Sequence, residues 1–259
     1  MSADPIFTPG KYMGGKLHKT KGIVLRPVKY GETSLVVTIF TELFGVQSYL
    51  VNGVRSTRKG ATKAPLFQPG ALLELVVYHN ELKHLNRISE YKWATLYDAV
   101  FADVPRNAIA LYMVELLQKT LKQPEGHPDL FHFAEDCLLA VDKCTGTALA
   151  NMPLFFAIHL CHFLGFRVTG NYSTDCAYFD LSEGCFVPEQ PHHPHFLEGK
   201  QATVTAQLLQ AQQPADLEEI RLHHDFRRNL LFVFETYYAL HVPDFGTLRS
   251  LPVLRDILS

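Results

Sequence analysis

The sequence lacks the features that place a chain in a membrane or in the secretory pathway. Its 259 residues contain no apolar run near the roughly 18 residues that span a bilayer, so we expect no transmembrane helix. The first residues do not show a basic segment followed by an apolar one, which is the pattern of a secretory signal. The five cysteines are odd in number, so we expect a reduced, cytoplasmic protein without a disulfide framework.

The motifs of the common catalytic sites are absent as well. The sequence contains no G-x-x-x-x-G-K-[ST] loop for nucleotide phosphates and no G-x-G-x-x-G turn after a predicted strand. It also contains no G-x-S-x-G elbow and no H-E-x-x-H metal site. We therefore find no sequence support for an enzyme.

The residues that could bind zinc lack the usual spacing. Cys176 and Cys185 flank a predicted turn, and His192, His193 and His195 follow soon after. Structural zinc sites commonly present their cysteines as C-x2-C pairs, and this sequence contains none. We therefore expect no metal and no other cofactor, with Cys176 and Cys185 as the candidates if a structural zinc were bound.

The charge is nearly balanced over the whole chain and uneven along it. The formal net charge is -2 at pH 7. Residues 1–90 contain 12 lysines and arginines against 6 acidic residues, whereas residues 91–259 contain 12 against 20. A basic first third attracts a polyanion such as a nucleic acid, although basic residues also occur on ordinary solvated surfaces.

The basic third also has the pattern of β-strands. We expect a flexible leader at residues 1–18 and then five strands, of which Leu82–Ser89 is the weakest. A long connection separates the third strand from the fourth. This arrangement favours a closed β-barrel of the OB type over residues 19–90, with an SH3-like barrel as the main alternative.

Beyond Glu90 the apolar residues repeat with the period of a helix, and Trp93 is expected at the start of this part. The sequence thus predicts a multidomain β plus α protein, with a mainly α-helical domain over residues 91–259. Its first helix is expected to start at Asp103 and Pro105.

Two later helices are also marked. Asn151-Met152-Pro153 precedes a segment that is apolar nearly all round, which is typical of a helix at the centre of a bundle. The last long helix is expected from Asp216 to about His241, with Glu219 completing a capping box. Tyr112, Phe155, Phe156 and Cys161 are expected in the helical core, and Glu115 is expected to have a structural role.

Basic side chains in the predicted barrel are the clearest functional signal. A groove for single-stranded nucleic acid combines cations for the phosphates with aromatic faces for the bases. The aromatic candidates are Tyr30, Tyr49, Phe67 and Tyr78. The candidate nucleic-acid-binding residues are Lys19, Lys21, Arg26, Lys29, Arg55, Arg58, Lys59, Lys63 and Arg87. Three of them lie in the loop VNGVRSTRKG, residues 51–60, which we expect at the rim of the barrel.

Several phrases follow one another in a definite order. They include KTKGIVLRPVKYGETSLVVTIFTELFG, LFQPGALLEL, FFAIHLCHFLGF, YFDLSEGCFV and RRNLLFVFETYYALHVPDFGTLRS. This ordered set resembles the RecO family of bacterial DNA repair proteins, which are recombination mediators, and the resemblance runs from about Lys19 to the C-terminus. It implies an N-terminal OB-fold, a helical domain and a zinc-finger-like insertion.

The resemblance also implies a function. Members of the family bind single- and double-stranded DNA and anneal complementary strands, and they are not hydrolytic enzymes. Membership would imply two partners, RecR and the single-stranded DNA-binding protein, with which the chain would help RecA to load. The place of action would be the bacterial cytoplasm, at the nucleoid during repair. Lys119, Lys122 and Arg167 are candidates, by charge alone, for contacting the tail of the binding protein.

The sequence departs from the family pattern in the insertion. Many members carry two C-x2-C pairs there, whereas only Cys176 and Cys185 are present here. We therefore expect that the β-hairpin at about residues 168–200 has lost its zinc and is held by packing alone. From the residues themselves, three other functions stay open: an RNA-binding OB module, a metal-dependent hydrolase, and a protein-interaction adaptor without DNA activity.

Overall fold

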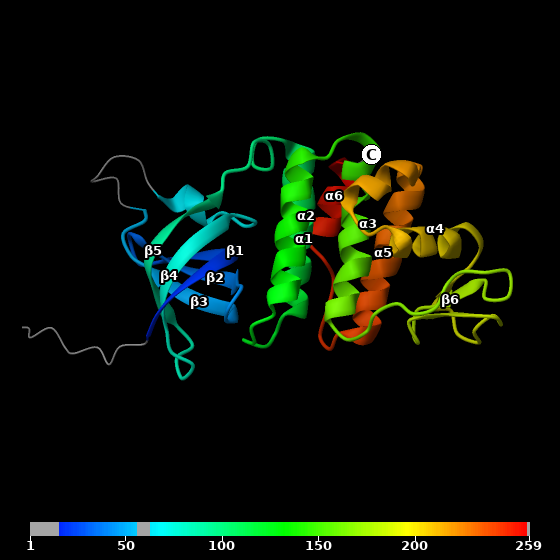
Figure 1. Ribbon diagram of the computed structural model, residues 1–259, viewed down its shortest axis with the longest axis horizontal. Coiled ribbons are helices and arrows are strands. Elements are labelled where there is room, and N and C mark those ends of the chain that lie inside the picture. Colours follow the sequence, from blue (N-terminus) through cyan, green and yellow to red (C-terminus); the bar gives the residue numbers. More distant parts are fainter. Residues whose placement is uncertain (1–15, 56–62, 258–259) are drawn as a thin grey trace, which may run out of the picture.

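Five strands in the first part of the chain close into a barrel (Figure 1). The computed structural model describes residues 16–55 and 63–257, and its strands pair in the order β1-β2-β3-β5-β4, with β4 returning to β1. All neighbouring pairs are antiparallel except β3 and β5, which run parallel. The strands are β1 (Lys16–Tyr30), β2 (Ser34–Thr41), β3 (Gly45–Val51), β4 (Leu72–His79) and β5 (Asn86–Thr95), and a 3-10 turn, η1 (Ala64–Phe67), precedes β4.

Alternation along the strands explains which side chains fill the barrel. Successive residues of a strand point to opposite faces, so every second residue lies inside. The interior residues of β2 and β4 are buried, as the sequence predicts: Leu35, Val37, Ile39, Leu73, Leu75 and Val77. Gly22 of β1 lies over the same interior, because an added Cβ would come within 2.6 Å of Ile39. The expected leader at residues 1–18 lies mostly outside the described residues, and its last three residues open β1.

The fifth strand starts later than the sequence predicts. A strand was expected at Leu82–Ser89, but β5 begins at Asn86, so Trp93 lies on this strand and not in the helical part. The reason is a turn that the side chain of Asn80 stabilises. Its Oδ1 accepts a hydrogen bond from the backbone N–H of Leu82, 2.9 Å away, and the local bonds of such a turn compete with strand pairing.

The second part of the chain is mainly helical. Its helices are α1 (Val104–Thr120), α2 (Pro128–Lys143), α3 (Gly146–Phe163), α4 (Gly199–Gln210), α5 (His224–His241) and α6 (Ser250–Ile257), with a 3-10 helix, η2 (Pro214–Glu219), before α5. Helices α1 and α2 stand between the barrel and the other helices (Figure 1). No helix within residues 16–55 and 63–257 combines the length and the hydropathy needed to span a bilayer.

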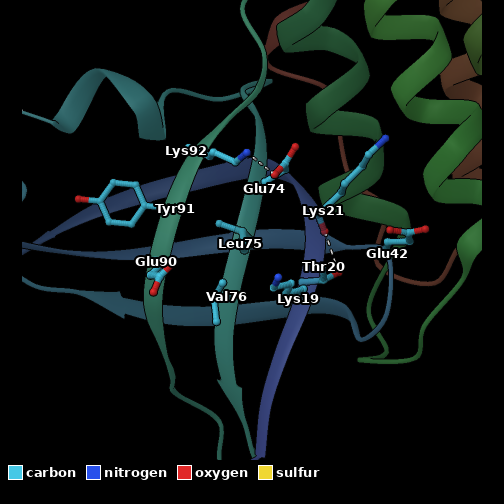
Figure 2. A pocket seen from close by; sticks show the side chains of 10 residues that line it. All are labelled: Lys19, Thr20, Lys21, Glu42, Glu74, Leu75, Val76, Glu90, Tyr91 and Lys92. Carbon is cyan, nitrogen blue, oxygen red and sulfur yellow. Dashed lines mark hydrogen bonds and ion pairs between the residues drawn. The ribbon is translucent and has the colours of Figure 1, made fainter.

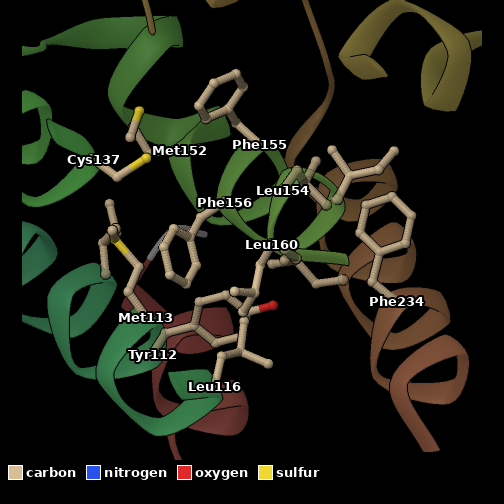
Figure 3. Close-up of a cluster of buried hydrophobic side chains, with 14 of the residues drawn as sticks. Tyr112, Met113, Leu116, Cys137, Met152, Leu154, Phe155, Phe156, Leu160 and Phe234 are labelled. Atoms are coloured by element: carbon tan, nitrogen blue, oxygen red, sulfur yellow. The ribbon is translucent and has the colours of Figure 1, made fainter. Parts of the chain in front are cut away.

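Helix α3 lies at the centre of the helical part. It is buried on nearly all sides and packs against α1, α2, α4 and α5. Figure 3 shows Phe156 of α3 beside Tyr112 and Met113 of α1, with Met152 near Cys137 of α2. The predicted core residues are confirmed as buried: Tyr112, Phe155, Phe156 and Cys161.

Two helix starts differ from the sequence prediction, and one agrees. Helix α1 starts as predicted, because Asp103 Oδ1 accepts the backbone N–H of Arg106 at 3.0 Å. Helix α3 begins earlier, at Gly146, and contains Pro153, because packing on all sides outweighs the roughly 3 kcal/mol that an interior proline costs. The prediction of a helix from Asp216 was wrong for α5, which begins at His224.

A local hydrogen-bond network explains the late start of α5. The carboxylate of Asp216 accepts the backbone N–H groups of Gln212 and Gln213 at 2.9 and 3.1 Å. It therefore caps the first turn of the 3-10 helix η2, and no α-helix begins at Asp216. The predicted capping box with Glu219 is not formed, and the box that is present joins Gln213 and Asp216.

Three short strands form the insertion between α3 and α4. The predicted hairpin is present as β6 (Tyr178–Asp180) and β7 (Cys185–Val187), and β8 (Phe196–Leu197) pairs on the other side of β6. One carboxylate ties the three strands together. Asp180 Oδ1 accepts the N–H groups of Ser182 and Glu183 in the turn, and Oδ2 lies 3.2 Å from Nε2 of His193, which precedes β8.

The barrel and the helices meet through a tight backbone contact. Gly45, at the turn between β2 and β3, has a φ of +62°, and an added Cβ would overlap the carbonyl oxygen of Glu125. From the other side, a Cβ on Gly126 would lie 2.5 Å from the carbonyl oxygen of Leu43. The turn of the barrel and the loop between α1 and α2 therefore approach so closely that both need glycine.

Candidate nucleic-acid interface

A row of side chains winds around the outer surface of the barrel. The strand registers place each member directly opposite the next on a neighbouring strand. We call this row the outer belt, and in order it contains Leu17, Tyr78, Arg87, Leu50, Val36 and Val28. The residues beside them in sequence, such as Tyr49 and Val77, point into the barrel and are buried.

The outer belt is apolar and largely accessible. Leu17, Tyr78 and Val28 are 51%, 40% and 44% exposed. The helices cover a different part of the outer surface, where Ile23 and Phe40 join the helical core. Contiguous exposed apolar side chains are a feature of interaction sites, so we take the outer belt as a candidate interface.

Basic residues gather at one end of the belt, around the turn between β1 and β2. Arg55 holds this turn, because its Nη1 donates to the carbonyl of Gly31 at 3.3 Å and its backbone N–H donates to Thr33 at 3.0 Å. The backbone N–H of Lys63 donates to the carbonyl of Val54, which places Lys63 beside Arg55 near the same turn. We call this group the basic rim, and it comprises Arg26, Lys29, Arg55 and Lys63. Arg58 and Lys59 lie outside the described residues.

The ammonium of Lys63 also contacts an aromatic ring. Its Nζ lies 5.7 Å from the centroid of Tyr91, which is itself 4.9 Å from the ring of Phe67. Glu32 is the acidic residue of the neighbouring turn, so the basic rim keeps a positive balance among these described residues. The rim and the belt together offer cations beside apolar and aromatic faces.

Lys19 and Lys21 lie elsewhere, in a groove on the surface of the barrel that is lined by residues of β1, β4 and β5 and by Glu42 (Figure 2). This groove of about 480 Å³ is lined by Lys19, Lys21 and Lys92 but also by the acidic residues Glu42, Glu74 and Glu90. Its charges therefore nearly cancel, and a polyanion gains little there.

The ammonium of Lys21 is occupied by the helical part. Its Nζ donates to both carboxylate oxygens of Glu135 on α2, at 2.9 and 3.0 Å. This hydrogen bond raises the pKa of Lys21 although partial burial opposes the shift. We therefore assign Lys21 to the contact between the barrel and the helices, and we leave it out of the proposed interface.

The predicted aromatic candidates divide into two pairs. Tyr30 and Tyr78 are 57% and 40% exposed and lie on the outer surface, where bases can reach them. Tyr49 and Phe67 are 0% exposed, so their expected role in base stacking was wrong. Tyr49 alternates with Leu50 and points inward, where burial raises the pKa of its hydroxyl, and Phe67 belongs to the same interior.

Sequence reasoning missed the apolar members of the belt. Alternation predicts which residues of a strand face outward, but it does not say which outward residues meet across strands. Leu50 and Arg87 are 37 positions apart in sequence and come together only because β3 and β5 pair in parallel. Their meeting follows from the closure of the barrel.

The other predicted site residues either contact another part of the protein or do not come together as a site. Lys119 Nζ donates to the carbonyl of Phe245 at 2.6 Å, and Lys122 Nζ donates to that of Pro243, so both hold the segment after α5. Arg167 lies in a groove with His159 and His162. Within residues 16–55 and 63–257, three side chains of the kinds that can bind a metal come together at His223, His224 and Asp225, and this group does not include Cys176 or Cys185.

The chain is similar to known proteins over nearly its whole length. The model of the N-terminal domain of recombination protein O matches residues 13–97, and the model of its C-terminal domain matches residues 102–252. The DNA repair protein RecO of Phocaeicola vulgatus is 33% identical over 244 residues, which are 94% of this chain and 100% of that protein. The proteins of the same name from Bacteroides fragilis and Flavobacterium psychrophilum are 32% and 30% identical, and each match covers 93% of this chain and 99% of the relative. The chain therefore belongs to the RecO family of DNA repair proteins.

Proposed function

We propose that this chain is a recombination mediator that binds DNA on the outer belt and the basic rim of its barrel. The supporting observation is the continuity of these two surfaces, which join exposed apolar and aromatic side chains to a cluster of cations. Single-stranded DNA presents the complementary surface, with phosphates on one side and unpaired bases on the other. Double-stranded DNA hides its bases and would rest mainly on the cations.

We also propose that the barrel is an OB-fold. Five strands in the order β1-β2-β3-β5-β4, with a parallel pair between β3 and β5, support this assignment over an SH3-like barrel. OB-folds bind oligonucleotides on one outer face and with the loops beside it. The outer belt and the turns at its ends occupy the corresponding positions.

Family membership supports the further steps of the proposal. In this role the chain anneals complementary strands and helps RecA to load together with RecR and the single-stranded DNA-binding protein. It works by binding and not by catalysis, at the bacterial nucleoid. No cofactor enters the proposal, because the insertion is tied together by the Asp180 network in place of metal ligands.

The first experiment is fluorescence anisotropy with a labelled single strand of about 30 bases, longer than the roughly 4–16 nucleotides that one OB-fold occupies. We expect salt-sensitive binding, because each phosphate contact releases counterions. The triple variant Arg55→Ala, Arg58→Ala, Lys59→Ala should bind more weakly and lower the slope of log Kd against log salt by about 2. Its melting temperature should fall only slightly, because the side chain of Arg55 makes one exposed hydrogen bond and such a contact contributes little to folding.

A matched control removes three cations from the helical part, in the variant Lys200→Ala, Arg221→Ala, Arg249→Ala. It should keep nearly the wild-type affinity, because these residues belong to the helical part and are not members of the outer belt or the basic rim. Equal losses in both triple variants would show that binding follows net charge alone and would contradict the proposed interface. Competition with an RNA strand of matched sequence tests the alternative of an RNA-binding module.

A further inference from the structure

The turn between β4 and β5 presents an apolar side chain to solvent. Leu82 is 91% exposed and Leu85 is 41% exposed. The turn projects from the end of the barrel between the two strands (Figure 1). It connects two members of the outer belt, because Tyr78 precedes it on β4 and Arg87 follows it on β5. The exposed leucines therefore continue the belt beyond the edge of the barrel.

Hydrogen bonds hold this turn in one shape. Asn80 accepts twice, at Oδ1 from the N–H of Leu82 and at its carbonyl from the N–H of Lys83, at 2.9 and 3.0 Å. Asn86 closes the base, because its Oδ1 accepts the N–H of Asn80 at 3.1 Å. Asn86 is only 3% exposed, and its amide donates to Gln47 of β3 at 3.4 Å. The tip is thus ordered before any ligand arrives, which reduces the entropy lost on binding.

Basic residues flank the apolar tip. Lys83 and His84 are exposed and separate Leu82 from Leu85, while Arg87 follows at the start of β5. Glu81 is the acidic residue of the turn. A single protruding leucine with basic neighbours is too small for a stable protein interface, which buries about 800 Å² on each partner. It has the size of the apolar wedges that enter between stacked bases.

We propose that the β4–β5 turn recognises the junction between single-stranded and double-stranded DNA, with Leu82 stacking on the last base pair. This inference rests on the proposed function, because the belt must first hold the single strand. Lys83 and Arg87 would contact the phosphates on either side of the junction. A mediator that anneals strands meets this junction each time a base pair is added. A leucine at the growing end of the duplex would favour the conformation in which the next base is still unstacked.

The test uses the full chain and a duplex with a single-stranded extension, carrying 2-aminopurine in the base pair next to the junction. Wild-type binding should raise the fluorescence, because Leu82 would replace the neighbouring base that stacks on 2-aminopurine and quenches it. Leu82→Ala should lose most of that rise and should lower the affinity for the junction by about fivefold, the loss of a single stacking contact. Its affinity for a plain single strand should stay within about twofold of the wild type, since the cations are unchanged.

Two further variants complete the experiment. Leu96→Ala removes another exposed leucine, 68% exposed, at the opposite end of β5, and it should behave as the wild type. Leu82→Phe should keep the fluorescence rise, because a ring stacks at least as well. An equal rise in wild type and Leu82→Ala overturns the junction contact but leaves the proposed function standing. Absence of any binding to a single strand by the wild type overturns the proposed function itself.

Discussion

A single buried carboxylate fixes the connection between the barrel and the first helix. Asp142 of α2 is 6% exposed, and its two oxygens accept the backbone N–H groups of Asp98, Ala99 and Val100 at 2.8–3.1 Å. Burial by itself raises the pKa of this carboxyl. The three N–H donors and Lys143 outweigh that effect and hold the pKa at about 2.

The first prediction concerns Asp142→Asn and pH. The folded pKa lies below the unfolded value of about 3.9, so the carboxylate stabilises the fold above that pH and the effect is lost as pH falls toward 2. The variant should lower the free energy of unfolding by about 2 kcal/mol at pH 7. Urea unfolding at pH 7, 4 and 2.5 measures this. The gap between wild type and variant should shrink at low pH, and a gap that stays constant would contradict the assignment.

At the scale of elements, one helix is capped by the side chain of another. Glu115 of α1 accepts the N–H groups of Arg249 and Ser250 at 2.9 and 2.7 Å, and the hydroxyl of Ser250 at 2.6 Å. These groups belong to the start of α6, where N–H donors lack partners within the helix. The structural role predicted for Glu115 is confirmed, and its partner is backbone at the far end of the chain.

A second prediction follows for Glu115→Ala. Removing the carboxylate leaves the first turn of α6 without its acceptor, which should cost about 1–2 kcal/mol. Amide hydrogen exchange should become faster in α6 and should stay unchanged in α4, which Glu115 does not contact. Uniform acceleration across all helices would mean that the variant loosens the whole fold and that the cap is not local.

The elements also show how far the sequence alone can lead. Alternation predicts the interior of the barrel because one residue in two meets the same environment. Asp103 predicts the start of α1 because its partner, Arg106, lies in the same turn. Pro153 misleads, because the packing that tolerates it comes from helices far away in sequence. The outer belt escapes prediction for the same reason, since its members come from all five strands.

At the scale of the molecule, the contact between barrel and helices combines close backbones with a row of basic and acidic side chains. His132 of α2 lies between two carboxylates, 3.3 Å from Glu42 of the barrel and 3.6 Å from Glu135 of its own helix. The carboxylate of Glu135 also accepts a hydrogen bond from the ammonium of Lys21. His132 and Lys21 each have an acidic neighbour on the other part of the molecule, so basic and acidic side chains alternate across the contact.

The third prediction compares two glycines with similar backbones. Gly31 and Gly45 have φ values of +58° and +62°, but only at Gly45 would a Cβ meet the backbone of Glu125. Gly31→Ala should therefore lower the free energy of unfolding only by the cost of placing alanine in the left-handed conformation, about 1–2 kcal/mol. Gly45→Ala should cost clearly more, because the barrel turn must also move away from the loop. Thermal unfolding of both variants measures the difference, and equal costs would show that the loop yields freely.

The barrel is closed by an uneven seam. β3 and β5 pair through Tyr49 with Asn86 and Leu50 with Arg87, a much shorter register than that of any other neighbouring pair in the barrel. Such a seam is the place where a barrel opens first when it fluctuates. Two members of the outer belt, Leu50 and Arg87, sit on opposite sides of it. A ligand that contacts both residues holds the two strands of the seam together. Binding to the outer belt and closure of the barrel are therefore thermodynamically linked, and each favours the other.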